Sequence, residues 1–161
     1  MRTVVGIDPG LASTGWGVVQ FDGTRYIHRA HGVVTTVSET PLAERLLKIY
    51  AEVKKVLDRF SPEEAGVEDL FFSKNATSAI AVAQARGVVL LALAQGRIPV
   101  GTYSPQQVKA AVIGRGKADK DQVQRLVAVV LGLSAIPEPD HAADALAIAI
   151  CHINRSHAYV Q

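Results

Sequence analysis

The feature that most constrains the fold of this chain is a set of acidic side chains placed against apolar segments. Asp8 and Glu68 each end a short apolar run. His141 and Asp144 open the otherwise apolar stretch 142–150. Ionised carboxylates in such places are costly unless a positive charge compensates them, and two of them about 4 Å apart repel by roughly 4 kcal/mol at an effective dielectric of 20. A divalent cation removes this cost, so the arrangement predicts a metal site.

Length and composition are those of an ordinary globular protein. The chain has 161 residues, 48% hydrophobic and 20% charged, and we expect one domain over residues 1–161. The single Cys151 excludes an intrachain disulfide, and no segment at the N-terminus resembles a signal peptide, so we expect a cytoplasmic protein. The longest apolar region, 76–94, is interrupted at residues 84–87, which argues against a membrane span.

Charge is distributed unevenly along the chain. Residues 1–73 carry eight basic and ten acidic side chains, whereas residues 74–125 carry eight basic and two acidic ones. An acidic site beside a basic middle third is what a metal-dependent enzyme acting on a polyanion needs. The alternative is a solvated surface with uneven charge, and charge alone favours that alternative.

The order of apolar segments predicts an α/β fold with a mixed five-stranded sheet. The predicted strands are 3–8, 15–21, 25–35, a short strand ending at Glu68, and 98–102. The predicted helices are 41–60 with Thr40 as N-cap, 75–95, 106–113, 120–131 and 140–152. The first three strands form an antiparallel meander with a hairpin at Asp22-Gly23. Helical crossovers then make the fourth and fifth strands parallel to the first.

This topology brings the acidic residues together. Neighbouring parallel strands place Asp8 beside Glu68, and a spacing of three places His141 and Asp144 on one helix face. Oxygen-rich sites suit Mg²⁺ or Mn²⁺, and an imidazole shifts the preference toward Mn²⁺. Two such ions about 3.5–4 Å apart can activate water and stabilise the leaving oxygen of a phosphodiester. The alternative is that each residue is a turn or cap residue, with Asp140 or His141 capping the last helix.

Six groups of residues occur in a fixed order along the chain. They are Gly6–Gly10 with Thr14–Gly17, Glu68–Asn75, Gln84–Gly87, Gln107–Lys109, Gly114–Gly116 with Lys120 and Gln122–Val123, and His141–Ala147. These groups and their order resemble those of the RuvC Holliday junction resolvases, which are crossover junction endodeoxyribonucleases of the ribonuclease H-like fold. The resemblance covers essentially the whole chain, and the ordered series is far more specific than any single motif.

The resemblance implies a ribonuclease H-like fold with a two-metal active site. Asp8, Glu68 and Asp144 match catalytic carboxylates of the family. The fourth position is commonly Asp in the family and is His141 here, which can bind a metal once it is neutral. Asp140 is an alternative that points elsewhere on the helix. The implied cofactors are two Mg²⁺ or Mn²⁺ ions held by Asp8, Glu68, His141 and Asp144.

The resemblance also implies residues that contact DNA. Phe71 matches an aromatic that inserts at the crossover, where an unpaired base offers a face for stacking, although one of two adjacent aromatics usually packs in a core. Lys109 and Lys120 match lysines near the substrate phosphates. Arg115 lies between two glycines, and we expect it to be either a cation on a mobile loop or an ordinary surface charge. The expected DNA-binding set is Phe71, Phe72, Lys74, Lys109, Arg115, Lys117 and Lys120.

The implied function is resolution of four-way DNA junctions by paired, symmetric nicks that leave 5′-phosphate and 3′-hydroxyl ends. The implied partners are junction DNA, a second copy of the chain that docks through the helix starting at Asn75, and a branch-migration motor complex. Two alternatives stay open. One is a non-catalytic junction-binding module. The other is a single-lobed nucleotide-binding protein of the actin and sugar-kinase type, suggested by the Asp8-Pro9-Gly10 turn, although that type needs two lobes.

Overall fold

The computed structural model describes residues 1–70, 75–114 and 117–157. This part of the chain contains a five-stranded sheet in the order β3-β2-β1-β4-β5. The strands are β1 (Arg2–Asp8), β2 (Ser13–Phe21), β3 (Tyr26–Thr35), β4 (Glu64–Glu68) and β5 (Val100–Tyr103). β2 is antiparallel to β1 and β3, whereas β4 is parallel to β1 and β5 is parallel to β4. The predicted mixed sheet, with its meander and parallel crossovers, is confirmed.

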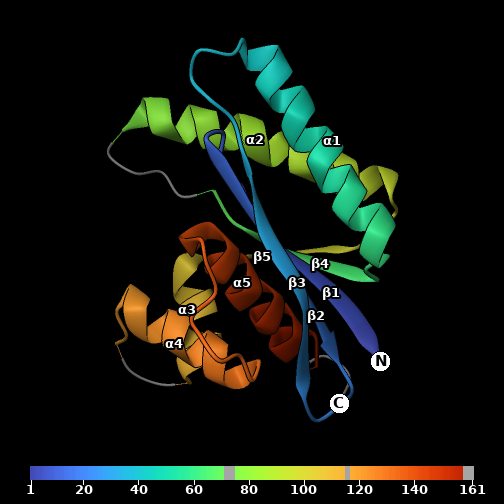
Figure 1. Cartoon of the computed structure of the whole chain (residues 1–161), viewed down its shortest axis with the longest axis vertical. Coiled ribbons are helices and arrows are strands. Elements are labelled where there is room, and N and C mark those ends of the chain that lie inside the picture. The colour runs from blue at the N-terminus through green and yellow to red at the C-terminus, as the bar shows by residue number, and fades with distance from the viewer. Residues whose placement is uncertain (71–74, 115–116, 158–161) are drawn as a thin grey trace.

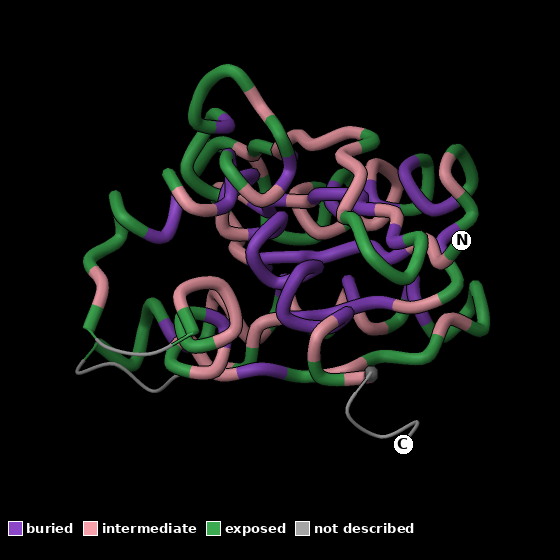
Figure 2. The backbone as a smooth tube through the Cα atoms, turned by 90° about the horizontal axis from the view of Figure 1, so that it is seen from below, coloured by how far each residue is buried: buried purple, intermediate pink, exposed green. Residues whose placement is uncertain are grey.

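Helices cover both faces of the sheet (Figure 1). They are α1 (Leu42–Phe60), α2 (Ala76–Gln95), α3 (Pro105–Ile113), α4 (Lys120–Val130) and α5 (Asp140–His157). α1 and α2 pack on the face to which Val5 and Ile7 of β1 point. α3, α4 and α5 pack on the face of Val4, the opposite side of the same strand. Figure 2 shows the buried backbone concentrated between the exposed outer segments.

Several element ends differ from the sequence-based expectation. The prediction that Thr40 caps the first helix was wrong: Pro41 is the N-cap of α1, and no side chain in the described residues caps this helix. The fifth strand begins at Val100 rather than at 98, because Ile98 donates its backbone N–H to Leu93 at the end of α2. α5 continues past the predicted end at residue 152, to His157.

A row of glycines lets α5 lie directly on the backbone of the sheet. Gly17, Gly6, Gly66 and Gly101 are neighbours across β2, β1, β4 and β5. A Cβ atom at Gly6 would overlap the carbonyl oxygen of Ala145 and lie 2.6 Å from the Ala149 nitrogen. A Cβ at Gly15 would likewise overlap the His141 carbonyl.

The backbone of α5 rests on Gly6, and the side chains of Leu146, Ile148 and His152 take up the space that Cβ atoms at Gly17, Gly66 and Gly101 would need. Helix and strands therefore approach more closely than side chains at these four positions would allow. The row therefore fixes the height of α5 above the sheet.

A partly buried polar network holds the other half of α5. His152 Nε2 lies 2.7 Å from Glu64 Oε2, and the Tyr103 hydroxyl lies 2.9 Å from His152 Nδ1. Arg2 donates two hydrogen bonds of 2.9 Å to the Glu64 carboxylate. The network joins α5 to β1, β4 and β5, and charge-assisted bidentate bonds of this kind are among the stronger hydrogen bonds in proteins.

The helix α2 is the one described helix whose length and composition would allow it to cross a membrane, which is weak evidence by itself. Its inner residues Ala85, Val89 and Leu93 are fully buried in the core shared with α1. Cys151 is also buried, and burial raises the pKa of its thiol to about 11. This thiol is therefore a core group with little thiolate character.

The glycine row makes a direct prediction about stability. Gly6→Ala should lower the free energy of unfolding by about 1–3 kcal/mol, the usual range for overpacking, because α5 must move away from β1. Gly96→Ala is the matched control, since the closest atom to its Cβ would be the flexible end of Ile98 at 3.2 Å, and the nearest backbone atom, Leu93 O, would lie at an ordinary 3.5 Å. Urea denaturation measures the free energy of unfolding of both variants. Equal stability of Gly6→Ala and the unsubstituted protein would contradict the proposed role of the row.

Candidate active site

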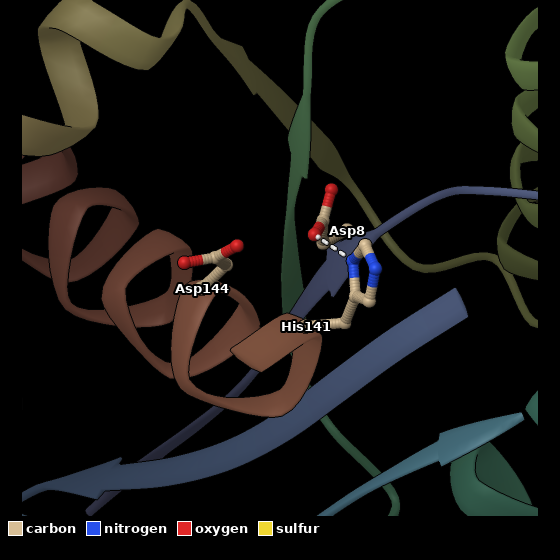
Figure 3. Close-up of side chains that lie close together, drawn as sticks. All are labelled: Asp8, His141 and Asp144. Atoms are coloured by element: carbon tan, nitrogen blue, oxygen red, sulfur yellow. Dashed lines mark hydrogen bonds and ion pairs between the residues drawn. The ribbon is translucent and has the colours of Figure 1, made fainter. Parts of the chain in front are cut away.

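Three described residues converge at the start of α5. Potential metal-binding atoms of Asp8, His141 and Asp144 all lie within 4.8 Å of one another. Asp8 ends β1, whereas the other two residues come from the first turns of α5 (Figure 3). His141 Nδ1 lies 2.9 Å from Asp8 Oδ2 and donates a hydrogen bond to it. The site therefore joins residues that are more than 130 positions apart in the sequence.

Local packing explains how these side chains meet. Asp8 is two residues after Gly6, so it points to the same sheet face, and it is only 8% exposed. The missing side chain of Gly15 lets the His141 backbone rest on β2. The His141 side chain is 47% exposed and reaches Asp8 from the rim. The hydrogen bond with Asp8, more than the opposing effect of burial, raises the pKa of His141.

Glu68 lies beside this group. The register of β1 and β4 pairs Ile7 with Val67, so the next residues, Asp8 and Glu68, are neighbours on one face. Burial, the hydrogen bond with Asp8 and the charges of Asp8 and Asp144 raise the pKa of Glu68 from 4.5 to about 8. Glu68 is outside the group whose atoms lie within 4.8 Å of one another, but its carboxyl clearly shares their electrostatic environment.

Asp144 is partly neutralised by Lys120. The Lys120 ammonium lies 3.4 Å from Asp144 Oδ2 and 3.6 Å from Asp140 Oδ2. Burial raises the pKa of Asp144, the Lys120 charge lowers it, and the Asp8 charge raises it further, with a net upward shift. A single lysine therefore does not compensate the acidic cluster.

The donor set fits a divalent cation. Carboxylate oxygens from three separate elements, joined by one imidazole, are ligands suited to Mg²⁺ or Mn²⁺. The raised pKa values of Glu68 and Asp144 show that burial and mutual repulsion make their charged forms unfavourable without a cation.

Asp140 does not face Asp8. Its Oδ1 accepts a hydrogen bond of 3.3 Å from Gln124 Nε2, and its other oxygen faces Lys120. His141 is thus the residue at this end of α5 that contacts Asp8. The contacts of Asp140 with α4 were not predicted, because no sequence signal specifies which helix packs beside α5.

Two predicted DNA-binding lysines lie next to the carboxylates. A cavity of about 180 Å³ opens between α3, α4 and α5. It is lined by Glu68, Pro105, Val108, Lys109, Lys120, Val123, Asp144, Ala147 and Ile148. Lys117 is exposed just before α4. The predicted residues Phe71, Phe72, Lys74 and Arg115 lie outside the described part of the chain.

Arg86 is a further residue at the site whose role was not predicted. Its Nε donates a hydrogen bond of 3.3 Å to the backbone oxygen of Glu68. The available sequence signal was its place in the motif Gln84–Gly87, which by itself names no partner.

Comparison with known proteins identifies the family. The family model for crossover junction endodeoxyribonuclease RuvC matches residues 4–152. The chain belongs to this family. Crossover junction endodeoxyribonuclease RuvC of Treponema denticola is 53% identical over 151 residues, 94% of this chain and 85% of that protein. Its counterpart in Thermotoga petrophila is 50% identical over 155 residues, 96% of this chain and 94% of that protein.

A solved structure agrees with this assignment. T. thermophilus RuvC in complex with a Holliday junction substrate superposes with a TM-score of 0.94 at 41% identity, over 99% of this chain and 97% of that chain. The resemblance and the ribonuclease H-like fold predicted from the sequence are confirmed. Family membership favours a nuclease over the nucleotide-binding alternative.

The raised pKa of Glu68 predicts how stability depends on pH. Without metal, the folded protein keeps this proton to a pH of about 8, whereas the unfolded chain releases it near 4.5. The folded state therefore binds more protons between these values, and the free energy of unfolding should fall as pH rises through them. Mn²⁺ competes with the proton, so it should raise the melting temperature more at pH 8 than at pH 6.

Glu68→Gln should remove most of this pH dependence and reduce the stabilisation by Mn²⁺. Differential scanning fluorimetry of both proteins, with and without Mn²⁺, provides the measurement. Identical pH profiles for the two proteins would show that Glu68 does not carry the raised pKa.

Proposed function

We propose that this protein is a structure-selective endonuclease that resolves Holliday junctions by two symmetric, metal-dependent phosphodiester hydrolyses. The observation that carries this proposal is the convergence of Asp8, Glu68, His141 and Asp144 at one end of the sheet in a chain of the RuvC family. The relative bound to a Holliday junction substrate supports the choice of DNA. Repair and recombination are the processes that such an activity serves.

The four residues Asp8, Glu68, His141 and Asp144 would hold two Mg²⁺ or Mn²⁺ ions. Divalent cations bound here supply the Lewis acidity that activates a water molecule and stabilises the leaving oxygen. The oxygens of Asp8 and Asp144 come from a strand and a helix that are packed against each other, which keeps their positions fixed. The hydrogen bond from His141 to Asp8 orients both side chains.

Lys109 and Lys120 would contact the phosphate at the cut. Both line the cavity beside Glu68 and Asp144, where each can neutralise phosphate charge, and Lys120 also pairs with Asp144. Water attacks phosphorus, the bond from phosphorus to the 3′ oxygen breaks, and a proton goes to that oxygen. The products are a 5′-phosphate and a 3′-hydroxyl end. Binding of such a polyanion through lysines should weaken as salt rises.

A homodimer completes the proposal. The outer face of α2 exposes Ile80 and Leu91, at 61% and 53%, although both are apolar. Gly87 lies between them along the helix and leaves open space above the backbone. Exposed apolar surface of this kind favours a protein–protein contact, and a two-fold dimer presents two sites to two strands. A branch-migration motor complex as partner and a cytoplasmic location remain predictions.

A further prediction concerns catalysis. Asp8→Asn should bind a synthetic four-way junction as tightly as the unsubstituted protein, but its cleavage rate should fall by at least about a hundredfold. Loss of an outer-shell partner of a metal ligand already lowers activity about tenfold to a hundredfold, and Asp8 is a proposed ligand itself. Gel-based cleavage in Mg²⁺ and Mn²⁺, with both nicks mapped, measures the rate. Asp58→Asn, an exposed substitution on α1, is the control.

If Asp8→Asn cuts at the normal rate in Mn²⁺, the assignment of Asp8 to the metal site is wrong. If the unsubstituted protein binds junctions but cuts none with either metal, the non-catalytic alternative is correct.

Another prediction concerns assembly. Leu91→Glu should convert the dimer into a monomer, because it places a charge at the proposed two-fold contact. Analytical ultracentrifugation measures the mass, with Val129→Glu on α4 as the control, since Val129 is apolar and 74% exposed but lies outside α2. A dimer that survives Leu91→Glu and dissociates in the control would place the interface on α4.

A further inference from the structure

Arg86 contacts the ends of two neighbouring strands from the helix α2. Its Nε donates a 3.3 Å hydrogen bond to the backbone oxygen of Glu68, and its Nη2 donates one of 3.5 Å to Thr102 Oγ1. The same Nη2 lies 3.8 Å from Asp69 Oδ1. The Arg86 side chain is 21% exposed, so the guanidinium is held largely within the protein.

The strand register explains why one side chain reaches all three acceptors. β4 and β5 are parallel, with Val67 beside Thr102 and Glu68 beside Tyr103. The planar guanidinium offers five donors in a fixed fork, which suits several oxygens better than an ammonium does. Arg86 therefore joins α2 to the ends of both β4 and β5.

Glu68 needs this support more than other residues of β4. It is the last residue of the strand, and once ionised its carboxylate is repelled by the charges of Asp8 and Asp144. Such repulsion favours rotation of the strand end away from the site. α2 and α5 cover opposite faces of the sheet (Figure 1), so Arg86 holds the Glu68 backbone from the side opposite the cluster.

We propose that Arg86 is a positioning residue of the metal site, which fixes the backbone of Glu68 so that its carboxylate stays directed at Asp8 and Asp144. This inference rests on the proposed metal-dependent reaction. Arg86 touches neither the substrate nor the metal, and it acts through the Glu68 peptide oxygen.

The direction in which metal-ion affinity changes when Arg86 is removed separates a positioning role from a purely electrostatic one. Arg86 is a cation near a cation site. If it acted only through its charge, its removal would increase affinity for a metal ion. If it positions Glu68, its removal decreases that affinity, because one carboxylate ligand is no longer held in place.

The experiment is calorimetric titration of the full chain with Mn²⁺ alone, without DNA. Arg86→Met should weaken Mn²⁺ binding by about tenfold, the lower end of the range for outer-shell partners of metal ligands. Arg86→Lys keeps the charge but cannot bridge the same acceptors, so it should also weaken binding. Arg125→Met, which removes an exposed arginine from α4, should leave the affinity unchanged.

A second variant keeps the test valid if Arg86→Met folds poorly. Thr102→Val removes one acceptor of the guanidinium while it leaves Arg86, Glu68 and every charge in place. It should weaken Mn²⁺ binding by about two- to threefold, as expected for loss of a single modest hydrogen bond. On junction DNA, both variants should lower kcat with little change in KM.

The outcomes distinguish this inference from the proposed function. If the unsubstituted protein binds no Mn²⁺, the metal-dependent function itself fails. If it binds Mn²⁺ and folded Arg86→Met binds equally well or more tightly, the positioning role of Arg86 is overturned while the proposed function stands.

Discussion

Direct contact between α5 and the strand backbone is the constraint on which the rest of the structure depends. Gly6 and Gly15 leave no side chain between the sheet and the helix, so the carbonyls of Ala145 and His141 occupy the space where Cβ atoms would be. At this height, residues in the first turns of α5 reach the end of β1. A helix held by branched side chains would lie farther away, and Asp144 would not reach the position of Asp8.

This contact makes an electrostatically unfavourable arrangement stable. The acidic cluster lies at the N-terminal end of α5, whereas the network of Arg2, Glu64, Tyr103 and His152 fastens the opposite half of that helix. The packed core and the satisfied network thus stabilise α5 although Asp144, near the start of this helix, is repelled by Asp8. A cation that relieves this repulsion binds more tightly for the same reason, because the protein has already positioned the ligands.

The sequence predicted those features that depend on local pattern or on an ordered set of motifs. The sheet topology followed from apolar runs and turn signals, and the positions of Asp8 and Asp144 followed from apolar runs that end or begin at a charge. Features that depend on tertiary contacts were missed. Thr40 does not cap α1, the fifth strand starts late because Ile98 donates its backbone N–H to Leu93 in α2, and the partner of Arg86 is a backbone oxygen that no motif specifies.

Anomalous scattering from a crystal of the protein soaked in Mn²⁺ tests most directly whether this packing builds a cation site. We expect a strong anomalous peak in contact with Asp8 and Asp144, with Glu68 and His141 turned toward the manganese positions. A well-ordered crystal in which these side chains keep their places and no anomalous peak lies among them would contradict the view that α5 is brought onto the glycine row to form a metal centre.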